Sequence, residues 1–268
     1  MELKALLASP IVLPSIPRVI ALLLSELDRS EPDLRKITQL ISTDPVLTTR
    51  LLQRGNAPSH GLPARVHSVT EALAILDLAD VRQLAAEAAS AASLKGVPGI
   101  NLPQFWNYSL NVARVARALA GVTRQNQGAA FTCGIIHAIG ELVMHVGMPQ
   151  QMAALNQELA PLDLRRAKVE FLRFSYCYAH VGAAYARHWH FPQPIVDALE
   201  HQYAPFANNV YEPLAGLIHL ATWRARAREA QLNERALAVT FPAEVGDVLG
   251  LDIDMVLQQD PFDWSAHA

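Results

Sequence analysis

Apolar side chains recur at three- and four-residue intervals along most of this 268-residue chain, and this spacing is the strongest constraint on its fold. Such spacing places the apolar residues on one face of an α-helix. A clear early example covers residues 16–27. No stretch shows the strict alternation of apolar and polar residues that is typical of a half-buried strand. The sequence therefore predicts an all-α protein.

Residues that favour helix N-termini indicate where several of these helices begin. Asp44 is followed directly by Pro45, so a capping side chain precedes a proline at the first helical position. Ser68 and Glu71 have the spacing of a capping box. The predicted capping residues are Ser15, Asp33, Asp44, Ser68 and Asp80.

Glycine and proline divide the chain into two helical lobes and a tail. The segment Gly96–Gly99 is the best internal boundary, which predicts an N-terminal lobe over about 10–95 and a second lobe over about 100–230. A weaker helical extension is expected over 231–268. The helices expected in the second lobe cover about 103–119, 127–146, 149–159, 163–174, 178–189, 194–203 and 211–230.

The composition argues against several classes of function. With 22 basic and 25 acidic residues, the net charge of −3 provides no general attraction to nucleic acid. We expect no membrane span, because the apolar runs are interrupted before they reach the roughly 20 residues that a span requires. The N-terminus lacks the apolar segment of a signal peptide. Cys133 and Cys177 fit buried thiols in a reducing compartment, so a cytoplasmic protein is expected.

Short motifs follow one another in a defined order. They are Leu13-Pro14-Ser15-Ile16-Pro17, Asp44-Pro45-Val46-Leu47, Arg50-Leu51-Leu52 and Asn56 in the first lobe, and Phe105-Trp106, the run Gly134–Gly140, Gly182-Ala183 and Trp189-His190-Phe191-Pro192 in the second. Together they resemble the HDOD family over about residues 10–230, with Asp77 where glycine is usual. The resemblance implies an N-terminal helical lobe packed on an HD-like helical lobe. It also implies a role in bacterial signal transduction.

The HDOD family is a branch of the HD superfamily of metal-dependent phosphohydrolases, so the resemblance implies where a metal site would lie. A divalent ion needs nitrogen and oxygen ligands that converge from several helices. The corresponding positions are Tyr108, the pair His137 and Ala138, Tyr178, Gln202 with Tyr203 beside it, and Thr222. Only His137 retains a metal-binding side chain, so the site is predicted to be degenerate, without metal or cofactor.

Two interpretations of His137 follow. In the first, its imidazole is buried and hydrogen-bonded to a neighbour such as Tyr108. In the second, His137 forms a residual metal site with His180 or His201. His180 lies two positions from the expected ligand position, and two positions turn a side chain by about 200° around a helix. The first interpretation is therefore favoured. The candidate ligand pocket consists of Tyr108, His137, Tyr178 and Thr222.

Two basic stretches could each bind a phosphate or an acidic partner. One contains Arg165, Arg166, Lys168 and Arg173, and the other contains Arg224, Arg226 and Arg228 after Trp223. A solvated helix face is the favoured interpretation of both stretches. Cys133 and His137 have the spacing to face each other on one helix, but the sequence offers no third group to orient them for nucleophilic catalysis.

The leading hypothesis is a non-catalytic regulatory protein. It would bind a protein partner or a small ligand in the groove between the lobes or in the former metal pocket. No specific nucleic acid and no membrane are expected as partners, and the oligomeric state is not predicted. The alternative is a metal-dependent phosphohydrolase that acts on a nucleotide or a cyclic dinucleotide.

Overall fold

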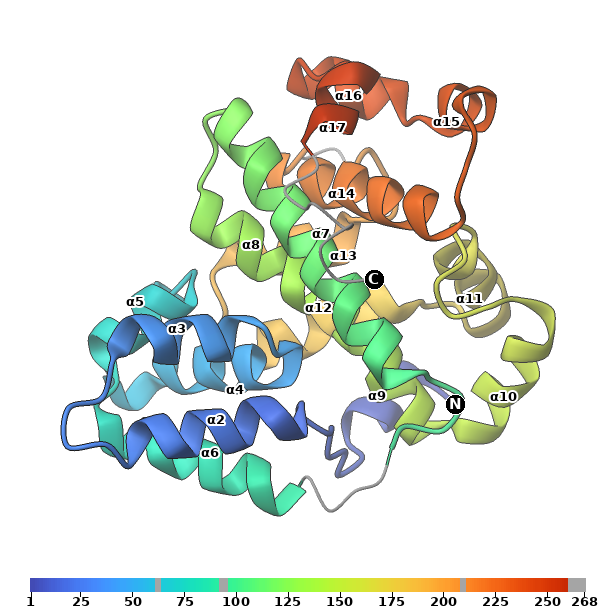
Figure 1. Cartoon of the computed structure of the whole chain (residues 1–268). Coiled ribbons are helices and arrows are strands. Elements are labelled where there is room, and N and C mark those ends of the chain that lie inside the picture. Colours follow the sequence, from blue (N-terminus) through green and yellow to red (C-terminus); the bar gives the residue numbers. More distant parts are fainter. Residues whose placement is uncertain (61–63, 92–95, 208–210, 260–268) are drawn as a thin grey trace.

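The computed structural model describes residues 1–60, 64–91, 96–207 and 211–259, and within these ranges the chain is helical and contains no strand (Figure 1). The all-α prediction is confirmed. The N-terminal helices gather at the lower left of Figure 1 and the C-terminal helices at the top, and the long helix α7 (Leu102–Val122) runs between them.

The N-terminal lobe is a small helical bundle. Its helices are α2 (Pro17–Leu27), α3 (Leu34–Ser42), α4 (Pro45–Gly55), α5 (Val69–Ile75) and α6 (Leu78–Ala91), and a 3-10 turn, η1, covers Pro58–His60. Helix α2 packs against α3 and α6, and α4 packs against α5 and α6. The apolar faces that the periodicity predicts are turned inward, since Leu23, Leu27 and Ile37 are completely buried.

The second lobe is built around α7. It contains α8 (Gln127–Ile136), α9 (Ile139–Gly147), α10 (Pro149–Glu158), α11 (Arg166–Phe174), α12 (Tyr178–His188), α13 (Gln193–His201) and α14 (Pro213–Glu229). Helix α7 packs against α8 and α14, and α12 packs against α9 and α13. The two lobes meet where α4 and α5 contact α8, and the apolar residues of both lobes join in one hydrophobic cluster.

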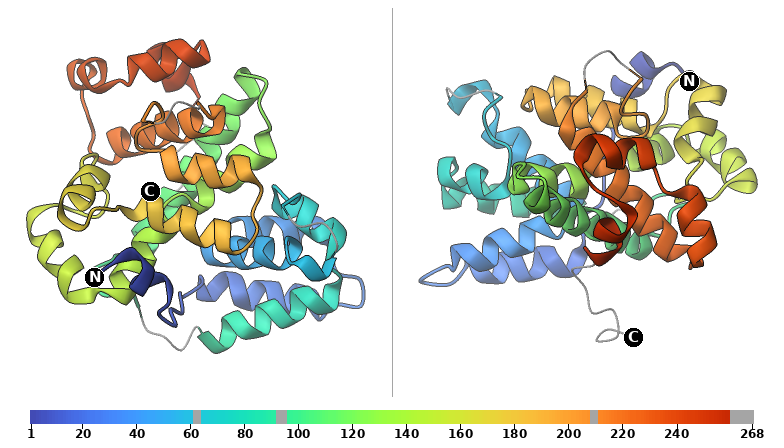
Figure 2. Two further views of the ribbon diagram at one scale, coloured as in Figure 1. Left: turned by 180° about the vertical axis from the view of Figure 1, so that it is seen from behind. Right: turned by 90° about the horizontal axis from the view of Figure 1, so that it is seen from above.

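The first helix, α1 (Leu3–Leu7), contacts the second lobe although it precedes the first one. It packs against α12, and the Tyr176 hydroxyl donates a hydrogen bond of 2.8 Å to the Met1 carbonyl oxygen. Figure 2 shows α1 beside the orange helices of the second lobe. The segment that connects α1 to α2, residues 10–16, has no regular secondary structure and passes from one lobe to the other.

Three short helices follow α14 in the predicted extension. They are α15 (Glu234–Thr240), α16 (Ala243–Leu249) and α17 (Ile253–Gln258), and α16 and α17 pack against α14. Val245, Leu251 and Val256 are buried in the same cluster as the core of both lobes. These helices are therefore part of the folded body. Residues 260–268 of the predicted extension lie outside the described residues.

Three of the five predicted caps are confirmed. Asp33, Asp44 and Ser68 each accept hydrogen bonds from backbone N–H groups two or three residues further on. The prediction for Ser15 is wrong, because α2 starts after Ile16 and has no side-chain cap. The prediction for Asp80 is also wrong, because Asp80 lies inside α6 and its N–H donates to Oδ1 of Asp77 at 2.8 Å.

Asp44 also joins the connecting segment to α4. It is completely buried, and its carboxylate accepts from the N–H of Ile16 as well as from those of Val46 and Leu47. Burial raises the pKa of Asp44 to about 6, against the opposing effect of these three donors. The Asp-Pro motif therefore both caps α4 and holds the entry to α2 in place.

Residues 127–147 are long and apolar enough to cross a membrane by length and composition alone, with a mean hydropathy of 1.5 over the best window. His137, Glu141 and His145 interrupt the run, so it is not a continuous apolar stretch. In the folded protein 89% of that window is buried, as in a core segment of a soluble protein. Helices α8 and α9 divide this run at His137 and Ala138.

Candidate functional site: a buried polar centre and an interlobe groove

The predicted single helix over 127–146 is broken at His137 and Ala138. Two glycines flank the break, and each allows a close contact between backbones. A Cβ on Gly134 would lie 2.4 Å from the Cα of Ala113 in α7, and a Cβ on Gly140 would lie 2.1 Å from the carbonyl oxygen of Tyr178 in α12. The chain thus approaches α7 before the break and α12 after it, which places His137 between these two helices.

His137 is a neutral, fully buried imidazole. Its Nδ1 lies 2.7 Å from the carbonyl oxygen of Gly134, and because a carbonyl can only accept, Nδ1 carries the proton. Nε2 has no hydrogen-bond partner among the described residues, and the ring packs edge-on against Tyr108 with 5.1 Å between centroids. Burial lowers the pKa of His137 to about 3. Tyr108 does lie next to His137, as predicted, but the two rings pack edge-on, and the hydrogen bond of His137 goes to Gly134.

Arg226 of α14 also lies beside Tyr108 and His137, and we call these three residues the buried polar centre. The sequence did not predict Arg226 at this position. It is 6% exposed, its Nε donates to the Tyr108 hydroxyl at 3.0 Å, and its guanidinium carbon lies 5.7 Å from the centre of the Tyr108 ring. The interpretation of Arg226 as part of a solvated face is therefore wrong. One sequence signal was available, since Arg226 follows Thr222 by four residues and so shares its helix face.

A buried ion-pair network adjoins the centre. Arg166 is completely buried, with Nη2 3.0 Å from Glu141 Oε1, Nε 2.8 Å from Glu170 Oε1, and Nη1 donating to the Leu159 carbonyl oxygen at 2.7 Å. The solvated-face interpretation is wrong for Arg166 too. Burial, and next the charge of Glu141, raises the pKa of Glu170 well above its usual range. The Arg166 guanidinium thus faces two carboxyl groups. Of these two, Glu170 is the more easily protonated.

The remaining predicted positions take other roles. Ala138 is buried in the break between α8 and α9. Tyr178 is buried at the start of α12, where its N–H donates to Glu170 Oε2 at 2.9 Å. The Gln202 side chain donates to the carbonyl oxygen of His137 at 2.9 Å, which satisfies a backbone acceptor at the break. Thr222 is half-buried, and its side chain acts against the rise that burial causes in the pKa of Tyr108.

Neither His180 nor His201 is grouped with His137. His180 Nδ1 accepts from the Cys177 N–H at 3.2 Å, and its ring contacts Phe171 and Tyr203. His201 lies instead in a half-buried cluster with Asp197 and Glu200 on α13. Within the described part of the chain this is the one group of three or more His, Cys, Asp or Glu side chains close enough to share an ion.

The side chains at the family's ligand positions do not fit a divalent ion. His137 offers one free nitrogen, Ala138 offers no ligand, and the Arg226 guanidinium is hydrogen-bonded to Tyr108. A metal ion would have to share this buried space with the Arg226 guanidinium, and an arginine side chain stays positively charged in proteins. Repulsion between the two charges is strong where little water is present to screen it.

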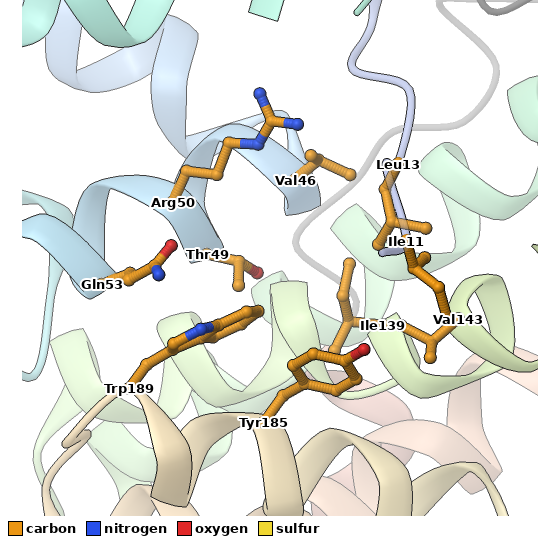
Figure 3. A pocket seen from close by; sticks show the side chains of 10 residues that line it. All are labelled: Ile11, Leu13, Val46, Thr49, Arg50, Gln53, Ile139, Val143, Tyr185 and Trp189. Atoms are coloured by element: carbon orange, nitrogen blue, oxygen red, sulfur yellow. The ribbon is translucent and has the colours of Figure 1, made fainter. Parts of the chain in front are cut away.

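A separate groove of about 170 Å³ opens between the lobes (Figure 3). Val46, Thr49, Arg50 and Gln53 of α4 form one wall, Tyr185 and Trp189 form the other, and Ile139, Val143, Ile11 and Leu13 complete the lining. The rings of Tyr185 and Trp189 lie 4.9 Å apart between centroids. The groove thus combines apolar and aromatic surface with one arginine, a composition typical of ligand sites.

The helical arrangement and the broken helix at His137 define the class, an all-α protein with an HD-like lobe. The HDOD domain family matches residues 13–205, which is more than half of the chain. This chain belongs to the HDOD family. The fold and family predicted from the sequence are therefore confirmed.

Individual relatives are distant. The MmoQ response regulator from Methylococcus capsulatus str. Bath has a similar crystal structure, with a TM-score of 0.74, 24% identity, and coverage of 93% of this chain and 98% of that one. A structure from Shewanella amazonensis SB2B, provisionally named a phosphohydrolase, has a TM-score of 0.54 and 26% identity, and the match covers 95% of this chain and 92% of that one. An uncharacterized protein of Treponema pallidum (strain Nichols) is 24% identical over 217 residues, which are 80% of this chain but 42% of that relative.

Proposed function

We propose that this chain is a non-catalytic HDOD protein that regulates a bacterial signalling pathway by binding a protein partner or a small ligand in the interlobe groove. The observation that carries the proposal is the position of Arg226, whose guanidinium is bonded to Tyr108 beside His137. The centre thus contains a fixed positive charge, which opposes the binding of a metal ion there. Ala138 and Thr222 supply no carboxylate to activate a water molecule, and the nearby Glu141 carboxylate is paired with Arg166.

The groove supports the binding part of the proposal. It lies between α4 of one lobe and α9 and α12 of the other, so an occupant would contact both lobes at once. A ligand that prefers one arrangement of the lobes shifts the population toward that arrangement. The name of the MmoQ relative, a response regulator, agrees with a signalling role for this fold. We expect the protein to act in the cytoplasm.

Elemental analysis of the full chain, purified without chelator and then incubated with Mn²⁺, Fe²⁺, Ni²⁺ or Zn²⁺, tests the non-catalytic assignment. The expected result is less than stoichiometric metal and no hydrolysis of phosphodiesters or nucleotides. His201→Ala is the matched control, because any ion on the Asp197, Glu200 and His201 cluster will be lost in that variant. One ion per chain that persists in His201→Ala but disappears in His137→Gln would contradict the proposal.

Substitution in the groove tests the binding assignment. Gln53→Arg places a bulky charged side chain in the groove from a half-buried position on α4. The variant is expected to fold normally and to lose any protein or metabolite that wild type retains from a lysate of the native host. Gln157→Arg, on an exposed position of α10, is the control and is expected to retain them. If Gln53→Arg retains every molecule that wild type binds, the groove is not the binding site.

A further inference from the structure

A second cavity lies between the lobes, at a different place from the groove and the buried centre. It has a volume of about 410 Å³ and is formed by α3 and α5 of the first lobe and by α7 and α8 of the second. This volume falls within the roughly 300–1,000 Å³ of small-molecule sites. The residues that line it are Arg35, Thr38, Gln39, Ser42, Thr43, Ser68, Val69, Thr70, Leu110, Arg114, Arg117, Gly128, Phe131 and Thr132. We call it the arginine cavity.

The arginine cavity has a concentrated positive charge. Arg35, Arg114 and Arg117 line it, and none of the described residues in its lining carries a carboxylate. This is unusual in a chain with more acidic than basic residues. Burial, together with the neighbouring charge of Arg117, lowers the pKa of Arg114 to about 10. Bringing an anion into the cavity would relieve this repulsion between guanidinium groups.

Neutral donors surround the arginines. The lining includes hydroxyl side chains from both lobes, among them Ser42, Thr70 and Thr132, and hydroxyls can donate to phosphate oxygens. Gly128, in the first turn of the ten-residue helix α8, also faces the cavity, so backbone N–H groups that the helix leaves free lie close by. Guanidinium groups bind phosphates through paired, charge-assisted hydrogen bonds.

Apolar side chains form another part of the lining. Phe131 lies beneath the guanidinium of Arg117, with 5.5 Å between the guanidinium carbon and the ring centre, and Leu110 and Val69 also line the cavity. An inorganic ion would leave this apolar surface uncovered, whereas an organic group attached to the phosphates could pack against it. The recessed shape of the cavity and the chain's net charge of −3 favour a small molecule over a nucleic-acid strand.

We propose that the arginine cavity binds a small organic phosphate with at least two phosphate groups. The assignment is independent of the groove and of the buried centre, since it shares no residue with either. Because the cavity is lined by both lobes, a bound phosphate compound would hold α3 and α5 against α7 and α8. The ligand would then stabilise one arrangement of the lobes.

Calorimetric titration of the full chain with ADP, at low and at physiological salt, tests the proposal. Wild type is expected to bind one ADP per chain, with pyrophosphate as a competitor. Arg117→Gln and Arg114→Gln are each expected to weaken binding by about ten-fold or more, since each removes a charge-assisted hydrogen-bonding group. Arg18→Gln, at an exposed position on α2 outside the cavity, is the matched control and is expected to bind ADP like wild type.

Three results would overturn the proposal. The first is that neither ADP nor pyrophosphate binds, and the second is that both arginine variants bind as wild type does. The third is that a 20-nucleotide single strand displaces ADP and loses affinity in the same variants, which would assign the cavity to a nucleic-acid surface. Arg114 is half-buried, so thermal unfolding is measured for each variant, and the exposed Arg117 provides a substitution that leaves the core intact.

Discussion

Replacing Arg166 by methionine is expected to lower the free energy of unfolding by about 3–5 kcal/mol, the cost of removing one partner from a buried ion pair. Methionine keeps much of the side-chain volume, so the loss reports on charge. Glu141 and Glu170 would remain buried without their cation, which lies 3.0 and 2.8 Å from them in the native protein. Chemical denaturation monitored by circular dichroism measures the change.

The same variant has a predictable pH dependence. Without Arg166, the folded-state pKa values of both carboxyl groups rise further above their unfolded values. A group of this kind supports the folded state at low pH and loses that contribution as the pH rises through its folded-state pKa. The deficit of Arg166→Met relative to wild type should therefore be larger at pH 8 than at pH 5. An equal deficit at both values would indicate lost packing instead.

Arg165→Met is the matched control for this substitution. Arg165 is the adjacent residue, its side chain is 72% exposed, and it pairs with Asp163 on the surface. Exposed ion pairs contribute about 0–1 kcal/mol. If the two substitutions cost the same free energy, the buried network has no special role in stability.

Gly140→Ala is expected to cost about 3 kcal/mol, at the upper end of the range for over-packed positions. The added Cβ would lie 2.1 Å from the Tyr178 carbonyl oxygen and 2.9 Å from the Gly182 nitrogen, so backbone atoms of α12 would have to move. A flexible side chain could turn away, but a helix backbone at this crossing cannot. The midpoint of thermal unfolding measures the loss.

Gly182→Ala tests the same crossing from the opposite helix. Its Cβ would meet the Ile139 side chain at 3.6 Å, an ordinary van der Waals contact. Because alanine favours a helix by about 1 kcal/mol over glycine, this variant should be as stable as wild type or more stable. Equal losses of stability from Gly140→Ala and Gly182→Ala would contradict this expected difference. They would show that neither helix accepts an added methyl group where α9 and α12 cross.

The helices and their order could be predicted because their signals are local. Asp33, Asp44 and Ser68 bond to N–H groups within three residues, and apolar spacing identifies the buried face of each helix. The prediction for Ser15 fails because α2 begins one residue later than expected, after Ile16. The prediction for Asp80 fails because two acidic residues stand near the start of α6. Asp77 and Asp80 lie three residues apart, and the backbone decides which of them caps α6.

The buried polar centre could be predicted only in part, because its contacts join distant segments. The family positions identify Tyr108 and His137, which do pack together. Arg226 lies 118 residues beyond Tyr108, and from the sequence alone it is one of three arginines on a helix. The break after Ile136 could not be predicted for the same reason, because it depends on where the backbones of α7 and α12 pass.

The contact of α1 with the second lobe has a consequence for folding. The Tyr176 hydroxyl meets the Met1 carbonyl oxygen across a sequence separation of 175 residues. Such a contact closes a very long loop, which is costly in chain entropy. We therefore expect α1 to dock late in folding, after the helices of the second lobe have packed. Ile11 and Leu13, which lie between α1 and α2 and line the groove, would then take their places after its two walls have assembled.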